Sequence, residues 1–155
     1  MDSSDSGSAA PVPEVRFGPA GWSYADWEGI VYPRPRPREF HPLDLLTELF
    51  ATIEVNATFY RDVTPRQVEA WCRRVEPRPD FRWSFKLHRR FSHGGVPPTP
   101  GALLEAARVF QPARDAGRLG ALLLQFPWSL RAAPATAGRL AELAQAAGDA
   151  GWPPV

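Results

Sequence analysis

The sequence predicts an α/β domain built on a parallel sheet. Segments rich in β-branched and aromatic residues alternate with segments whose apolar residues recur every three or four positions. The alternation occurs four times, with strands expected to begin near residues 15, 53, 81 and 120. Strands that alternate with helices pair in parallel through right-handed crossovers. An open doubly wound sheet and a closed eight-stranded barrel both contain such units, but a complete barrel needs about 250 residues and this chain has 155.

The first half of the chain is expected to supply two strands and two helices. A short β-prone segment at residues 15–18 runs into glycines and a proline, which predicts a strand that enters a loop. Apolar residues at helical spacing predict a helix over residues 43–50. Residues 52–60 alternate β-branched and aromatic side chains and form the clearest strand pattern in the sequence. Thr64 as an N-cap and Pro65 as the first helical residue then predict a second helix.

The second half repeats the pattern. Residues 81–87 predict a third strand, and apolar residues over 103–110 predict a helix that Gly117 closes. Residues 120–126 are almost wholly apolar, which is typical of a strand buried on both faces. Residues 135–147 are rich in alanine and predict a final helix.

Composition excludes several classes of protein. With 18 basic and 17 acidic residues, the net charge of +1 is too balanced to indicate a nucleic-acid or anionic-membrane partner by electrostatics alone. No apolar run approaches the ~20 residues that a membrane helix needs. A lone cysteine, Cys72, cannot form an internal disulfide and lies on the apolar stripe of the second helix, so we expect it to be buried and inert. A reducing compartment, the cytoplasm, is therefore the expected location.

Several short strings of residues occur together in an order that is typical of one family. The most specific is Glu54-x-Asn56-x-Thr58-Phe59-Tyr60. The others are Gly18-Pro19-Ala20-Gly21-Trp22-Ser23-Tyr24, Trp27, Tyr32-Pro33, Trp71, residues 81–86, Ser92-His93 and residues 119–127. With these strings the chain resembles the YecE-like family, catalogued as a domain of unknown function (DUF72), over roughly residues 15 to 145.

The resemblance implies a TIM-type (β/α) barrel, here truncated to about four βα units, that is, a half barrel. Residues 14–150 would form this partial barrel, between a disordered lead at residues 1–13 and a tail at residues 151–155. One departure is mild, because Ser92 keeps the hydroxyl where the family usually has threonine. The other is the missing second half, which would leave strand edges unpaired. A homo-oligomer or a complementing second half-barrel is therefore an expected partner.

Polar residues occupy alternating positions near the ends of two predicted strands. Glu54, Asn56 and Thr58 share one face of the second strand, because successive side chains of a strand point to opposite faces. Lys86 lies near the end of the third strand. Working residues of such barrels lie at the carboxyl ends of strands, and the lumenal face is the one not packed on helices. We therefore expect Glu54 and Lys86 to converge as the catalytic residues.

Two interpretations of this pair stay open. A buried carboxylate and a buried ammonium each cost several kcal/mol unless they are paired, so Glu54 and Lys86 could form a purely structural ion pair. Alternatively, Glu54 acts as a general acid or base and Lys86 anchors the substrate or acts as a nucleophile, including in Schiff-base chemistry.

The other candidate residues are expected to bind the substrate. Aromatic residues after the first strand could stack on a sugar or a base, or pack over the barrel mouth. The basic loop after the third strand suits an anionic substrate, or is simply solvated. The glycines of residues 18–21 could let backbone N–H groups approach a phosphate, or form a plain turn. The candidates are Trp22, Ser23, Tyr24, Asn56, Thr58, Tyr60, His88, Arg89, His93 and Gln125.

The expected function is acid–base chemistry of a hydrolase, lyase or isomerase type on a small polar or phosphorylated substrate. The alternative is a non-catalytic binding module for nucleic acid, through Arg89, Arg90 and Trp22, or for another anionic ligand. A third possibility is a truncated product without activity. No metal site is expected, because the histidines lack a zinc-type spacing, and the cofactor is unknown.

Overall fold

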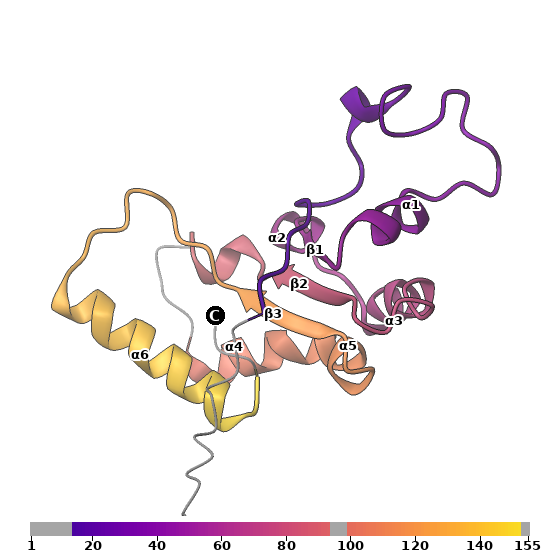
Figure 1. The fold of residues 1–155 in the computed structure, drawn as a ribbon. Helices are drawn as coiled ribbons and strands as arrows, with labels where there is room; N and C mark the ends of the chain where they lie inside the picture. Colours follow the sequence, from indigo (N-terminus) through magenta and orange to yellow (C-terminus); the bar gives the residue numbers. More distant parts are fainter. Residues whose placement is uncertain (1–13, 94–98, 153–155) are drawn as a thin grey trace, which may run out of the picture.

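The computed structural model describes residues 14–93 and 99–152 (Figure 1). The predicted lead at residues 1–13 and the last three residues of the predicted tail lie outside these ranges. Within them, three strands form one parallel sheet in the order β1-β2-β3. The strands are β1 (Thr52–Val55), β2 (Arg82–Lys86) and β3 (Leu119–Leu123). Strands that follow one another in sequence are therefore neighbours in the sheet, as the strand–helix alternation predicts for parallel pairing.

Helices connect the strands and follow β3. They are α1 (Pro42–Leu49), α2 (Ala57–Tyr60), α3 (Pro65–Arg74), α4 (Pro100–Ala107), α5 (Gln111–Asp115) and α6 (Pro134–Asp149), with short 3₁₀ turns η1 (Ala25–Trp27), η2 (Arg89–Phe91) and η3 (Arg108–Phe110). The predicted start of α3 is confirmed. Thr64 and Gln67 form a capping box, and Pro65 is the first helical residue. Gly117, at φ +63°, follows α5 as predicted.

The core lies against one face of the sheet. Ile53 and Val55 of β1 and Trp83 and Phe85 of β2 are completely buried. Phe85 stacks on Phe110 at 4.5 Å between ring centroids. Figure 1 shows α4, α5 and α6 on one side of β3. Because side chains alternate along a strand, the residues between these core positions point to the opposite face of the sheet.

The first predicted strand is wrong. Val15 and Phe17 are exposed, at 70% and 76%, and the segment pairs with β1 only through one parallel bridge between Ala20 and Glu54. At Gly18 a Cβ atom would lie 1.8 Å from the Thr52 carbonyl oxygen, so the backbones approach too closely for a regular ladder. The next residue is a proline without an N–H to donate. The described residues therefore contain three strands, not the four that were predicted.

The second predicted strand is shorter than expected. It ends at Val55, and Ala57–Tyr60 form the single turn α2. Thr58 is buried with its hydroxyl within hydrogen-bonding distance of the carbonyl oxygens of Val55 (2.7 Å) and Lys86 (2.5 Å). These contacts give the Val55 and Lys86 carbonyl groups a hydrogen-bond donor where the strand pairing stops. They stabilise the helical turn although the segment has a high β propensity. Thr58 consequently does not share the face of Glu54, contrary to the alternation argument.

The last strand is less buried than its apolar sequence predicts. In β3 only Leu122 is buried, whereas Leu119, Ala121 and Leu123 are partly exposed. Leu122 pairs with Phe85 and so belongs to the core face. β3 is an edge strand of the described sheet. The expected burial on both faces is therefore wrong for these residues.

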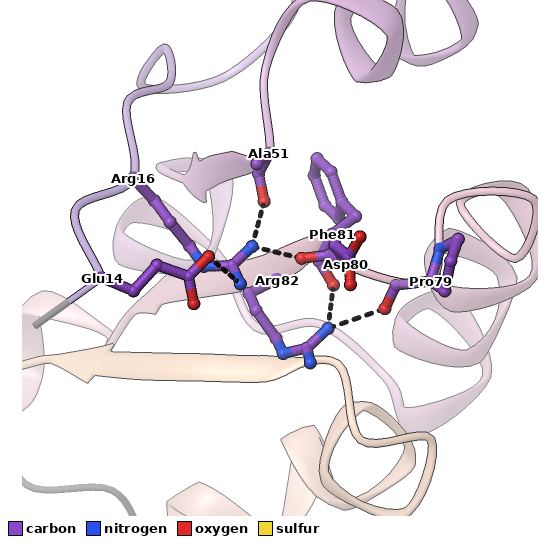
Figure 2. A network of polar contacts seen from close by, with 7 residues as sticks. All are labelled: Glu14, Arg16, Ala51, Pro79, Asp80, Phe81 and Arg82. Carbon is purple, nitrogen blue, oxygen red and sulfur yellow. Dashed lines mark hydrogen bonds and ion pairs between the residues drawn. The ribbon is translucent and has the colours of Figure 1, made fainter. Parts of the chain in front are cut away.

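The amino ends of the strands are held by two arginines (Figure 2). The Arg16 guanidinium donates to the carbonyl oxygens of Asp80 and Ala51 and pairs with Glu14 at 2.6 Å. Arg82 donates to the carbonyl oxygens of residues 79 and 81 at 2.9 and 3.0 Å. These bonds satisfy carbonyl groups that precede β1 and β2. This end of the sheet thus has a structural role, and the candidate site lies at the opposite end.

Candidate functional site

An ion pair joins the two strands near their carboxyl ends. Lys86 Nζ lies 2.9 Å from Glu54 Oε1, and the two side chains are 12% and 27% exposed. In the register Glu54 is opposite Ser84, so the Lys86 side chain reaches diagonally back along the sheet. Both residues alternate with core positions and therefore point to the face of the sheet opposite the core, where Phe59 of α2 lies beside Lys86. The structure thus brings together the acid and the amine that the sequence selects as the catalytic pair.

A buried aromatic ring lies beside this pair. The Lys86 ammonium is 5.7 Å from the centroid of the Phe59 ring, within cation–π range. The His93 ring meets the same phenyl ring edge-on at 5.4 Å, and His93 Nδ1 is 2.8 Å from the Ser92 hydroxyl. Phe59 therefore connects the ion pair with the loop after β2. The sequence did not select Phe59, because strand alternation assigned it to the helix-packed face.

A first cavity, of about 270 Å³, opens between the loop at residues 20–24 and the carboxyl end of β1. Trp22, Ser23, Tyr24, Asn56 and Arg61 contribute to its wall. The Asn56 amide and the Tyr24 hydroxyl both donate to the Ala20 carbonyl oxygen, which fixes the loop against β1. This cavity gathers three of the predicted loop residues with Asn56.

A second cavity, of about 520 Å³, lies between α2, η2 and α4. Thr58, Arg61, His88 and Arg90 are among its lining residues. Arg90 pairs with Asp62 at 3.1 Å, and His88 Nδ1 accepts a hydrogen bond from the Arg90 backbone N–H at 3.2 Å. Because Nδ1 accepts, His88 acts here as a cap for η2. Neither Glu54 nor Lys86 lines either cavity.

The remaining candidates do not converge on the ion pair. Trp22 packs against Trp71 and Trp83, at 5.6 and 5.9 Å between centroids, and so contributes to the core. Tyr60 is 68% exposed, and Arg89 is also exposed. Gln125 is exposed two residues beyond the end of β3. The expected convergence of Gln125 with Glu54 and Lys86 is not seen among the described contacts.

Arg61 is a candidate that sequence reasoning missed. It follows α2 directly and lines both cavities. Its guanidinium forms no hydrogen bond or ion pair within residues 14–93 and 99–152. The only sequence signal was its place at the end of the Glu-x-Asn-x-Thr-Phe-Tyr string.

Other titratable groups are structural. Cys72 is buried as predicted, and burial raises the pKa of its thiol to about 11. Burial also lowers the pKa of His41, whose Nδ1 caps α1. In the part of the chain that the structure describes, no three His, Cys, Asp or Glu side chains are grouped to hold a metal ion. The helices of that part are all too short or too polar to cross a bilayer.

Comparison with known proteins bears on the fold. Residues 16–152 match a family described as "Protein of unknown function DUF72". A crystal structure of a DUF72 family protein from Enterococcus faecalis V583 at 3.10 Å resolution superposes with a TM-score of 0.60 and 14% sequence identity, covering 72% of this chain and 42% of that chain. A structure of the same protein at 2.52 Å resolution gives a TM-score of 0.58, 16% identity, and coverage of 69% and 44%. No curated protein matches the chain.

This chain therefore spans less than half the length of the Enterococcus protein, and at such low identity the superposition shows a shared fold only. The family match extends over most of the sequence, and the strings that suggested the family all lie within it. The resemblance inferred from the sequence is thus confirmed. The chain belongs to the DUF72 family of proteins of unknown function.

Proposed function

We propose that the described sheet is one arc of a TIM-type (β/α) barrel. Three features support this proposal: the strands follow in sequential parallel order, helices lie between them in the chain, and the segment through Ala20 runs beside β1 where a preceding strand would lie. The Enterococcus relative is more than twice as long as the region it shares with this chain. A complementing half-barrel or another copy of the chain is the proposed partner, because it would pair with the edge strands of the described sheet.

The function that the geometry supports best is acid–base catalysis on a small polar or phosphorylated molecule. The observation that carries it is the Glu54–Lys86 pair, held at 2.9 Å near the carboxyl ends of adjacent strands, on the face of the sheet opposite the core. In this proposal Glu54 transfers a proton to or from the substrate. Lys86 orients Glu54 and stabilises negative charge that develops on the substrate. Such a pair is suited to hydrolase, lyase or isomerase chemistry.

The competing interpretation is a purely structural ion pair, and ligand binding separates the two. The chain is screened against small polar and phosphorylated metabolites by thermal shift, and each compound that stabilises it is retested on Glu54→Gln. Glu48→Gln is the matched control, because Glu48 is an exposed glutamate of α1 that pairs with Arg78 far from the site. Stabilisation lost only in Glu54→Gln supports the site. Compounds that stabilise all three proteins equally would assign Glu54 a structural role.

The nucleic-acid-binding alternative has less support in the structure. Arg90 is paired with Asp62, and Trp22 packs against Trp71 and the buried Trp83. A stacking platform needs an accessible ring face, and a phosphate-tracking groove needs unpaired cations. Salt-dependent binding to single-stranded oligonucleotides would favour this alternative. In either case we propose that the protein works in the cytoplasm, because a reducing compartment is where proteins with free cysteines such as Cys72 are usually found.

A further inference from the structure

The side chain of Arg61 lies at the wall between the two cavities of the site. Other arginines of the chain have carboxylate partners, as Arg90 has in Asp62 and Arg74 in Asp44. Arg61 has no such partner in the described part of the chain, although Asp62 follows it in sequence. An exposed guanidinium at a cavity wall, whose N–H groups donate to no protein acceptor, is suited to binding the anionic group of a ligand.

The smaller cavity offers further donors and carries a positive charge. Of its lining residues Arg61 is the one with a charge. Ser23 presents a hydroxyl at the same wall, and the Asn56 amide has a second N–H beyond the one donated to Ala20. The backbone of Gly21 has φ +106°, a conformation that is strained for residues with a side chain. Glycine therefore leaves the cavity wall without a side chain at this position.

The volume of the cavity limits what it can hold. At about 270 Å³ it is slightly smaller than the range typical of sites for whole drug-sized ligands. It therefore suits one charged group of a larger molecule or a small metabolite. Glu54 lies near the carboxyl end of β1, two residues before Asn56, which precedes α2. A ligand anchored at Arg61 would have its other end within the carboxyl-end region of the sheet.

We propose that this cavity is an oxyanion-binding subsite, in which Arg61, assisted by Ser23 and Asn56, holds the phosphate or carboxylate group of a small ligand. The proposal rests on the proposed function and narrows its substrate class to anionic compounds. Guanidinium forks bind both kinds of group through paired N–H···O bonds, so the shared chemistry is the oxyanion. Phosphate and carboxylate are distinguished by experiment.

The test is an NMR titration of the ¹⁵N-labelled chain with inorganic phosphate, and separately with acetate, at constant ionic strength maintained with chloride. Phosphate is expected to shift the amide signals of Gly21, Trp22 and Ser23. In Arg61→Gln the affinity should fall about tenfold or more, because a charge-assisted bidentate contact is lost. Arg61→Lys should give an intermediate loss, since it keeps the charge without the fork.

Arg66→Gln is the matched control, because Arg66 is an exposed arginine of α3 outside both cavities. It should bind phosphate as the unaltered chain does. Equal losses in Arg61→Gln and Arg66→Gln, or shifts confined to residues 88–93, would overturn the proposal. A larger response to acetate than to phosphate would assign the subsite to carboxylates.

Glu54→Gln distinguishes this proposal from the proposed function. It should leave the Arg61-dependent phosphate affinity in place, since Glu54 does not line the cavity. A chain that does not bind phosphate or acetate, but still loses metabolite binding in Glu54→Gln, refutes the subsite alone. If the chain binds phosphate through Arg61, but Glu54→Gln changes neither metabolite binding nor turnover, the catalytic proposal alone is refuted.

Discussion

The hydroxyl of Thr58 lies 2.5 Å from the carbonyl oxygen of Lys86, the residue whose ammonium pairs with Glu54. Thr58 is 3% exposed and belongs to α2, whereas Lys86 ends β2. One short contact thus ties the turn after β1 to the end of β2. It places the two strand ends so that the carboxylate and the ammonium meet.

Replacing Thr58 with valine tests this tie. The variant keeps the shape of the side chain but removes the hydroxyl next to the Val55 and Lys86 carbonyl oxygens. The free energy of unfolding should fall by about 1–3 kcal/mol, the cost of unsatisfied buried polar groups. Urea denaturation measures the change, and Thr58→Ser should retain most of the stability. A loss below that of Thr47→Val, whose hydroxyl makes only a local helical contact at 3.3 Å, would contradict the role of Thr58.

Removal of one partner of the Glu54–Lys86 pair should cost more than removal of both. Glu54→Gln or Lys86→Met leaves a largely buried charge without its partner, at an expected cost of about 1–3 kcal/mol in unfolding free energy. The double variant should lose less than either single variant, and a double-mutant cycle by denaturation measures the coupling. The exposed Glu69–Arg73 pair, with side chains more than half exposed, is the control and should show a coupling of at most about 0.5 kcal/mol.

Cys72 should make stability fall at high pH. Burial raises the pKa of its thiol from 9.0 to about 11, so the folded chain keeps the proton over a range in which the unfolded chain releases it. Because the folded state then binds more protons, the free energy of unfolding should decrease as the pH rises from about 9 towards 11. Cys72→Ala should have a flatter profile over that range. Identical slopes in the two proteins, measured by urea titration at each pH, would disprove the assignment.

Two glycine substitutions should have opposite effects. Gly18→Ala places a Cβ atom 1.8 Å from the Thr52 carbonyl oxygen, and the contact is with backbone that cannot rotate away. The variant should lose more than about 2 kcal/mol of stability, within the range of severe steric changes. Gly138→Ala in α6 meets nothing within 4 Å and should gain about 0.5–1 kcal/mol through helix propensity. Thermal unfolding of both variants checks the pair, and a tolerated alanine at Gly18 would contradict the close approach.

Features that depend on nearby residues could be predicted from the sequence. The start of α3 follows from Thr64, Pro65 and Gln67, which act within one helical turn. The contact between Glu54 and Lys86 follows from two rules. Side chains alternate between the two faces of a strand, and strands that are consecutive in the chain pair in parallel. These predictions needed no knowledge of distant packing.

Features decided by distant residues could not be predicted. The turn at Ala57–Tyr60 depends on a contact between Thr58 and Lys86, which are 28 positions apart. The loss of the first strand depends on how closely Gly18 approaches Thr52. Arg61 became a candidate only because the loop at residues 20–24 folds against the end of β1 and leaves a cavity there. In each case local propensity was overridden by a partner that the local pattern does not identify.

The catalytic role of Glu54 is the central claim, and turnover tests it most directly. A compound that stabilises the chain in the metabolite screen is incubated with the unaltered protein, with Glu54→Gln and with Glu48→Gln, and product formation is followed by NMR. If Glu54 transfers a proton in the reaction, kcat should fall by about 10²–10⁴-fold in Glu54→Gln and stay unchanged in Glu48→Gln. A Glu54→Gln variant that is folded and turns over its substrate at the unaltered rate would contradict the account.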